Sequence, residues 1–470
     1  MSKSSGKKIR IKELDEFYTP YTVRAALTKG DVFTYISMLI MGFGNMVRGQ
    51  IVKGLLFLGI EAAYVWFMIT KGIGFLSMLP SLGWLEQTKQ WNEKKQVFEY
   101  TAGHDSVLIL LYGVITIGIT AFFIMTWCAS LKSSYKAQCL KKAGVRLKSI
   151  KDDIKDLFDI NLHKLLLAVP LTGITAFTVL PLIFMICMAF TNYSKAWPGN
   201  GNENHLILFD WVGLKNFGDI LNFNNRMGQE FWSVLGWTIV WAIFATFLNY
   251  LFGMILAIVI NRQGTRFKAF WRFCFVISIA MPQFVSLLIM RTVLSQDGAI
   301  NQMLQNLGWI DRPLPFWTDA TYARVSVIAI NLWVGIPYTM LQVTGILQNI
   351  PAELYESAKV DGANAFVTFF KITLPYMLFV TTPYMITQFT GNINNFNVIF
   401  LLSGGGPVST DYYFAGKTDL LVTWLYKLTI DQKDYNLGAV IGILTFIVLA
   451  TVSLVTYRNT ASYKDEGAFQ

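Results

Sequence analysis

The chain has 470 residues, of which 54% are hydrophobic and 14% are charged, whereas soluble globular proteins carry about 25% charged residues. This composition excludes an ordinary soluble domain and predicts a membrane protein. The net charge of +10 comes from basic residues that cluster in particular loops, which favours a role in membrane orientation over nucleic-acid binding. The four cysteines form no CxxC pair and the three histidines lie far apart, so neither a disulfide framework nor a metal site is expected.

The first 50 residues are expected to form a cytoplasmic arm followed by an interfacial helix. Residues 1–14 are polar and basic and have no apolar core, so we do not expect them to be a cleavable signal peptide. The stretch Asp31–Met46 is apolar, but it is short and contains Gly42 and Gly44. We expect an amphipathic helix there, with a ninth membrane span as the alternative.

About eight later runs are long and apolar enough to cross a bilayer as helices, because a hydrocarbon core about 30 Å thick needs roughly 20 apolar residues. The predicted spans are Ile51–Thr70, Val107–Ala129, Leu165–Phe190, Phe231–Ile260, Phe270–Leu294, Val325–Leu347, Pro375–Leu402 and Leu437–Tyr457.

Loop charges predict the orientation of these spans. The segment after the second span is rich in lysine and arginine, as are the loop after the fourth span and the N-terminal arm, and such loops stay cytoplasmic. We therefore predict a multi-pass plasma-membrane protein with both termini and the loop 348–374 in the cytoplasm. The expected organisation is a two-span module with a basic cytoplasmic segment at 51–160, followed by a six-span core at 161–470.

The loop 350–375 has the pattern of a small helix–turn–helix. Pro351 suits the first turn of a helix, and Glu353 and Glu356 favour the positive end of its dipole. Gly362 can adopt the positive φ that ends a helix, and Pro375 is expected to open the next span. An amphipathic protrusion of this kind suits a groove on another protein.

This loop resembles the EAA loop of binding-protein-dependent ABC permeases, with Ser357 in place of one alanine. The resemblance implies an all-α protein whose six-helix core has the type I importer (MetI-like) fold. It also implies that the loop docks into a cleft on a partner ATPase, present in two copies, and transmits its closure. The residues that would carry this coupling are Glu353, Glu356, Ala358, Gly362, Ile372, Leu374 and Pro375.

The chain is not expected to hydrolyse ATP or to bind a cofactor itself. Gly416-Lys417-Thr418 reads like the end of a P-loop, but Asp411 occupies the position of its first glycine. A membrane-embedded enzyme is also disfavoured, because the sequence has no HExxH motif and no paired acids within the spans.

Polar residues within spans are costly and usually functional. The seventh predicted span contains Gln388, Asn392 and Asn395, and the sixth contains Asn331 and Tyr338. Amides and hydroxyls beside aromatic rings are typical of carbohydrate sites, and we favour a ligand pocket there. Hydrogen bonding between helices by the same amides remains the alternative.

From about Phe209 onward, the chain resembles the larger permease subunit of maltose and maltodextrin importers. The segments that carry this likeness are Trp211–Phe217, Asn331–Tyr338, Asn392–Phe396, Gly404–Pro407 and Lys417–Leu421. The resemblance implies that an oligosaccharide, such as maltodextrin, lies against Val334, Gly335, Tyr338, Gln388, Gly391, Asn392 and Asn395. It also implies a second, different permease subunit and an extracellular solute-binding protein.

Two departures from that family bear on the substrate and the partners. Gly391 replaces an aromatic residue, which would widen the cavity. The external loop 191–230 is short where Gram-negative relatives have a folded domain, which suggests a single-membrane bacterium and a binding protein tethered as a lipoprotein. The glycine-rich turn at 403–407 is expected outside the membrane, either as a plain turn or as a gate or docking point.

The mechanism expected from the resemblance is ATP-driven alternating access. The main alternative is an ion-coupled secondary sugar transporter, which would need ionisable groups inside its spans. Glu61 is the clearest such group, but it lies outside the predicted six-span core.

Overall fold

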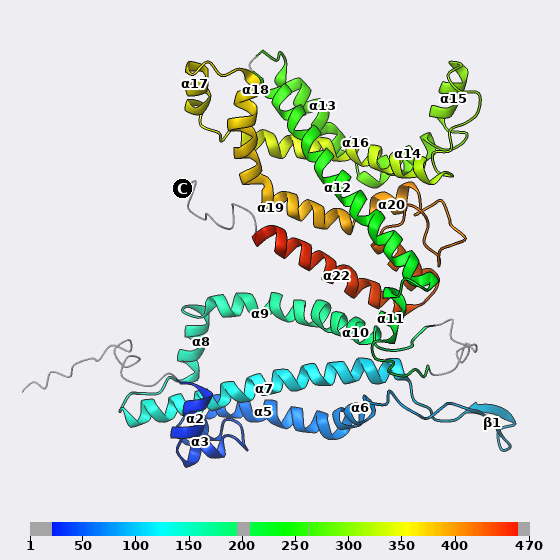
Figure 1. The fold of residues 1–470 in the computed structure, drawn as a ribbon. Helices are drawn as coiled ribbons and strands as arrows, with labels where there is room; N and C mark the ends of the chain where they lie inside the picture. The colour runs from blue at the N-terminus through cyan, green and yellow to red at the C-terminus, as the bar shows by residue number, and fades with distance from the viewer. Residues whose placement is uncertain (1–20, 195–206, 263, 459–470) are drawn as a thin grey trace, which may run out of the picture. The chain divides into compact units, whose positions relative to one another are not determined.

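The computed structural model describes residues 21–194, 207–262 and 264–458. Residues 1–14 and part of the loop 191–230, for which the sequence analysis made predictions, lie outside the described residues. Contacts divide the chain into two compact units (Figure 1). The first comprises residues 1–187 and 200–211, and the second comprises residues 188–199 and 212–470. Most of the helix 162–188, which was expected to open the six-span core, belongs to the first unit.

Seven helices within the described residues are long and apolar enough to cross a membrane, and they lie at seven of the eight predicted positions. They are Ile51–Met78, Ser106–Lys142, Leu162–Met188, Arg226–Asn261, Ala320–Leu347, Ala365–Ile393 and Tyr435–Arg458. The remaining predicted span, Phe270–Leu294, is a pair of helices bent by 88° and counts as an eighth span only if the pair crosses together.

The first unit is built on the long helix α7, which α5 and α6 follow on one side (Figure 1). Its elements are α2 (Val23–Lys29), α3 (Val32–Ile36), α4 (Phe43–Val47), α5 (Ile51–Phe67), η1 (Met68–Gly72), α6 (Ile73–Met78), β1 (Lys89–Asn92), β2 (Val97–Tyr100), α7 (Ser106–Lys142), α8 (Ile150–Phe158), α9 (Leu162–Ile174), η2 (Thr175–Val179) and α10 (Leu180–Met188). The antiparallel hairpin β1–β2 was not predicted, because it lies in a polar loop between two apolar runs.

The stretch Asp31–Met46 is not a single helix, because it folds into the short helices α3 and α4 around a turn, and neither of these is long enough to be a candidate span. Gly42 in this turn has φ +79°, and a side chain there would collide with the backbone of Gly54. Both helices contact α7. Arg48 joins α4 to α7, because its guanidinium donates hydrogen bonds to the carbonyls of Gly44 (2.9 Å) and Ser134 (3.0 Å).

Arg48 is 7% exposed and forms an ion pair with Asp31. Burial raises the pKa of Asp31, but hydrogen bonds from Arg48 and Thr34 outweigh this effect and hold the pKa below its ordinary value. A buried charge is tolerated only when it is paired and hydrogen-bonded, so this cluster is a structural anchor of the N-terminal segment.

The second unit is built on α12, which packs along α16 and α19 (Figure 1). Its elements are α11 (Lys215–Leu221), α12 (Arg226–Asn261), α13 (Lys268–Ala280), α14 (Gln283–Val293), α15 (Ala299–Asn306), α16 (Ala320–Leu347), α17 (Ala352–Val360), α18 (Ala365–Thr368), η3 (Phe369–Thr373), α19 (Leu374–Ile393), α20 (Phe396–Leu402), α21 (Leu421–Tyr426), η4 (Lys427–Asp431) and α22 (Tyr435–Arg458). Gly253 lets α12 approach α16 closely, because a side chain there would lie 2.5 Å from Thr339.

Two predicted spans of this unit are interrupted. Met281 and Pro282 are extended, with ψ values of 131° and 126°, and separate α13 from α14. Proline lacks an N–H and disfavours helical geometry in the residue before it, so the helix ends there. The predicted span Pro375–Leu402 breaks at Asn394, and Asn395 then caps α20 by accepting a hydrogen bond from the Val398 amide (3.3 Å).

The sequence analysis expected Pro375 to open a span, but the proline lies inside a helix. The helix already begins at Ala365, after the N-cap Asn364, and runs through the proline. The π-helical turn η3 ends at Thr373, two residues before Pro375, and the missing N–H of the proline interrupts the helical hydrogen bonding at this place.

Candidate functional site

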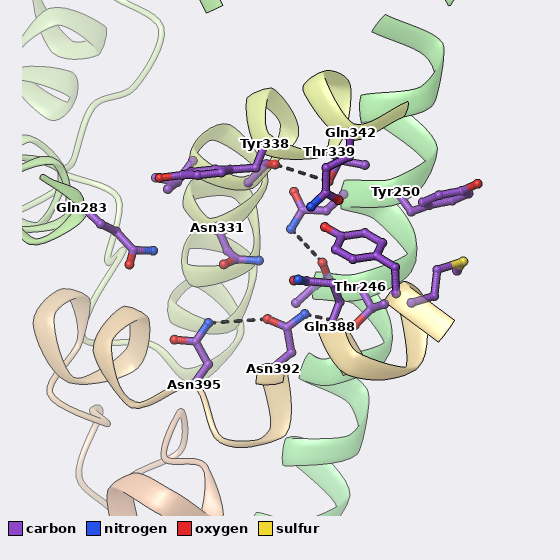
Figure 2. A pocket seen from close by; sticks show the side chains of 16 residues that line it. Thr246, Tyr250, Gln283, Asn331, Tyr338, Thr339, Gln342, Gln388, Asn392 and Asn395 are labelled. Carbon is purple, nitrogen blue, oxygen red and sulfur yellow. Dashed lines mark hydrogen bonds between the residues drawn. The ribbon is translucent and has the colours of Figure 1, made fainter. Parts of the chain in front are cut away.

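A polar pocket lies between α12, α16 and α19, with one residue contributed by α14 (Figure 2). Its cavity volume is about 240 Å³. The residues that line it are Ala245, Thr246, Asn249, Tyr250, Gln283, Asn331, Val334, Gly335, Tyr338, Thr339, Gln342, Tyr384, Met385, Gln388, Asn392 and Asn395. No member of this set carries a charge, so the pocket suits a neutral ligand with many hydrogen-bonding groups.

Asn392 links the walls of the pocket. Its side-chain amide donates a hydrogen bond to Thr246 Oγ1 on α12 (3.0 Å), and its Oδ1 accepts one from Asn395 (3.5 Å; Figure 2). Its backbone carbonyl accepts a hydrogen bond from Trp241 Nε1 (3.0 Å). The break between α19 and α20 therefore has a definite geometry, and it presents two amides at the edge of the cavity.

Two other amides in the pocket wall have a polar atom that is buried without a protein partner. They are Asn331 Nδ2 and Asn249 Oδ1. Asn331 lies on α16 with only 6% of its surface exposed. A buried donor or acceptor that makes no hydrogen bond costs about 1–3 kcal/mol. The two unpartnered atoms therefore indicate a binding site in which a bound polar molecule supplies the missing hydrogen bonds.

Tyrosines supply the apolar surface of the pocket. Tyr338 is 49% exposed, and its ring lies beside the cavity (Figure 2). Tyr250 is instead held in place by a hydrogen bond between its hydroxyl and Thr381 Oγ1 (2.7 Å). A free ring next to fixed amides can stack on a flat apolar face of a ligand whose edges carry hydroxyl groups.

Six of the seven residues expected around the substrate line this pocket: Val334, Gly335, Tyr338, Gln388, Asn392 and Asn395. Gly391 does not line it, and the space where its side chain would extend is empty for 4 Å. A Cβ on Gly335 would lie 2.6 Å from the Asn249 amide, so this glycine allows α16 to pack against that residue.

The α12 wall was missed in the sequence. Thr246, Asn249 and Tyr250 lie inside a long apolar run, where three polar groups hardly change its hydrophobic character. An Asn-Tyr pair in the middle of a predicted span is nevertheless a usable indication, because amides are expensive in a bilayer.

The predicted coupling loop forms a helix–turn–helix at the opposite end of α12 from α11 (Figure 1). The first helix is α17, and Gly362 follows it with φ +72°, the left-handed conformation expected there. Tyr355 fixes α17 against the next helix through a hydrogen bond between its hydroxyl and Thr373 Oγ1 (3.1 Å). Ala358 is buried behind it.

The outer face of this loop is apolar and uncovered. Leu354, Val360 and Phe366 are 42%, 87% and 70% exposed. Glu353 and Glu356 are also exposed and form no ion pair with any described residue. Of the other expected coupling residues, Gly362 and Pro375 are exposed, and Ile372 and Leu374 are partly buried. The exposed apolar and acidic groups fit a docking surface, since large apolar side chains rarely cluster on a surface without a partner.

Glu61, the clearest ionisable group that an ion-coupled transporter could have used, has a structural contact. Its carboxylate accepts a hydrogen bond from the backbone amide of Met41 (2.7 Å), in the first unit. The described residues hold no group of three or more His, Cys, Asp or Glu side chains that could bind a metal.

The glycine-rich turn is packed against a buried carboxylate. Asp419 is fully buried and accepts hydrogen bonds from the Gly416 amide (2.7 Å) and from Lys427 Nζ (2.6 Å). Burial raises the pKa of Asp419, and the nearby Lys427 counteracts that rise. Gly405 has φ +81°, and a Cβ there would lie 1.9 Å from Asp419 Oδ1, so only glycine fits.

We therefore expect Gly405→Ala to lower the free energy of unfolding by about 2–3 kcal/mol, because it forces a side chain into a buried ion pair. Gly404→Ala is the matched control, since Gly404 also has positive φ (+60°) but has open space around it. Backbone strain alone should cost that variant about 1–2 kcal/mol. Thermal unfolding of the purified protein measures both, and equal melting temperatures would contradict the steric argument.

The fold and the site together define a multi-pass membrane protein with a polar pocket among its span helices and a protruding helix–turn–helix in the same unit. Residues 249–461 match the family described as the binding-protein-dependent transport system inner membrane component. The galactooligosaccharides transport system permease protein GanP of Bacillus subtilis is 33% identical over 91% of this chain and 97% of its own length. The chain belongs to this family, the permease subunits of ABC importers.

Other relatives extend the comparison. The maltodextrin transport system permease protein MdxF of Bacillus subtilis is 32% identical over 94% of this chain and 98% of its own length. The maltose/maltodextrin permease MalF of Escherichia coli is 37% identical, over 53% of this chain and 49% of its own. A solved structure also matches: a bacterial alginate ABC transporter in complex with a pentasaccharide-bound periplasmic protein. One of its chains covers 66% of this chain with a TM-score of 0.51 and 21% identity, which indicates a shared fold.

Proposed function

We propose that this chain is the permease subunit through which an ABC importer moves a neutral oligosaccharide, maltodextrin, across the plasma membrane. The observation that carries the proposal is the uncharged pocket, in which fixed amides and an exposed tyrosine ring surround an open cavity. Galactooligosaccharide and maltodextrin permeases that match nearly the whole chain support this class of substrate.

The pocket residues would share the recognition of the sugar. Asn331, Gln388 and the pair Asn392 and Asn395 would hydrogen-bond to hydroxyl groups, while the Tyr338 ring would stack on the apolar face of a sugar unit. Val334 and Gly335 would shape the wall between them.

Transport would proceed by alternating access. An extracellular binding lipoprotein would deliver the sugar, and a second, different permease subunit would complete the translocation path. Two copies of an ATPase subunit would bind the loops at the cytoplasmic side, where both termini of this chain also lie.

The coupling loop would transmit ATPase closure to the pocket. The apolar residues Leu354, Val360 and Phe366 would enter the ATPase cleft, and Glu353 and Glu356 would make polar contacts there. Gly362 permits the turn, Ala358 packs α17 closely, and the residues Ile372, Leu374 and Pro375 join the loop to α19. A push on α17 would therefore pass through the contact between Tyr355 and Thr373 to the helix Ala365–Ile393, which carries Gln388.

The test is ATP-driven uptake of labelled maltotetraose into vesicles that hold the full transporter complex, with an unlabelled galactooligosaccharide of equal length as competitor. We expect saturable uptake that requires ATP and the binding protein, and only weak competition. Strong competition would show that the galactooligosaccharide is the better substrate, in which case maltodextrin would be the wrong sugar and the class of transporter would stand. Uptake that a proton or sodium gradient drives without ATP would refute the importer mechanism.

A further inference from the structure

The first unit contains a second polar cavity, of about 410 Å³, whose lining is basic. Five cationic residues surround it, together with two acids. The cations are Lys53, Lys136, Arg146, Lys148 and Lys164, and the acids are Asp153 and Asp156. The proposed transport function uses none of these groups.

The positive charge of this cavity is only partly neutralised. Lys53 pairs with Asp153 (3.3 Å), and Lys148 pairs with Asp156. Arg146 and Lys164 form no ion pair with any residue that the structure describes. Lys136 also forms no ion pair with a described residue, and its ammonium lies 5.3 Å from the centre of the Tyr21 ring. The lining therefore has more cations than acids, which is the arrangement that binds a phosphate group.

The ends of three candidate spans place this cavity at a membrane surface. Gln50 precedes α5, Leu140 lies in the last turn of α7, and Asn161 precedes α9. Each of these helices is long and apolar enough to cross the bilayer, so the residues at their shared end lie near the lipid headgroups.

Helix α8, which contributes Asp153 and Asp156 to the cavity, has the character of an interfacial helix. Its other face exposes Ile154, Leu157 and Phe158, by 51%, 36% and 63%. These residues are spaced three and four apart, so they form one apolar stripe beside the acids. A short amphipathic helix that links two spans can lie with this stripe in the lipid, and its polar face then borders the cavity.

We propose that this cavity binds the phosphate of an anionic phospholipid, such as phosphatidylglycerol, whose acyl chains lie in the adjoining leaflet. The surplus cations recognise the phosphate, and the apolar stripe of α8 contacts the acyl chains. The bound lipid joins α5, α7 and α9 at one membrane surface and so stabilises the N-terminal module.

The test uses the complete transporter in nanodiscs that contain equal amounts of phosphatidylglycerol and phosphatidylcholine, with native mass spectrometry of the lipids retained on release. Wild type is expected to retain phosphatidylglycerol preferentially. Arg146→Gln and Lys164→Gln, tested separately, should each weaken this retention about fivefold, the effect of one cation near a lipid phosphate.

Lys155→Gln is the matched control, because it removes one charge from the same segment but does not line the cavity. It should leave the retention unchanged, and an equal loss in the control would show diffuse surface attraction and overturn the proposal. Equal retention of both lipids by wild type, a readout that needs no variant, would also overturn it. So would release of the lipid by millimolar glycerol 3-phosphate, because the ligand would then be a soluble phosphate.

Discussion

Asn331→Leu is expected to raise the sugar concentration that half-saturates transport about 30-fold while leaving the protein at least as stable as wild type. The Nδ2 atom of Asn331 is buried in the pocket wall without a partner. Its removal therefore breaks no hydrogen bond of that amide nitrogen within the described protein. A bound sugar would lose a donor in a desolvated site, which costs about 2 kcal/mol, or roughly 30-fold in affinity.

The experiment separates a ligand pocket from amides that only join helices. Asn261→Leu is the matched control, because Asn261 lies outside the pocket and its amide donates to Thr344 Oγ1 (3.1 Å) and to the carbonyl of Ala257 (2.7 Å). It should lower the melting temperature without changing the sugar dependence. Sugar-stimulated ATPase activity and thermal unfolding are measured on the same complexes. If Asn331→Leu lowered stability and left the sugar dependence unchanged, the pocket interpretation would be wrong.

Hydropathy located the helices because a spanning segment must be long and apolar whatever its neighbours are. It did not locate the breaks. Pro282 offered a clear indication of one, since a proline in the middle of a long apolar run either kinks or ends a helix. The break at Asn394 depends on Asn392 and Asn395 bonding to α12 and α20, and such contacts are set by packing that no local pattern specifies.

The candidate pocket was likewise predicted only in part, because some of its residues follow from the sequence and others depend on helix packing. Gln388, Asn392 and Asn395 are polar groups within one predicted span, so the sequence already indicated them as candidate pocket residues. Which residues of α12 face them depends on how that helix is rotated, and this is why Asn249 was not foreseen. Gly391 does not line the cavity although Tyr384, about 20° from it around the same helix, does, because a glycine has no side chain that could reach the cavity wall.

Glu356→Ala is expected to reduce ATP-driven uptake 10- to 100-fold while sugar binding to the pocket stays unchanged. The Glu356 side chain is exposed and has no ion pair within the described chain, so its removal should not disturb α17. Its expected partner is a polar group in the ATPase cleft, and a hydrogen bond to a charged group contributes about 1.5–3 kcal/mol. Losing it would uncouple ATPase closure from the helix that leads to Gln388.

Lys359→Ala provides the control for Glu356→Ala, because Lys359 is exposed on the same helix and is not among the expected coupling residues. Uptake into vesicles and binding of labelled sugar to the purified complex are measured for both variants. Loss of uptake with retained binding, in Glu356→Ala alone, would assign the role to this carboxylate. If Glu356→Ala transported as well as wild type, the coupling contact would have to lie elsewhere, and the exposed apolar side chains of Leu354, Val360 and Phe366 would be the next surface to test.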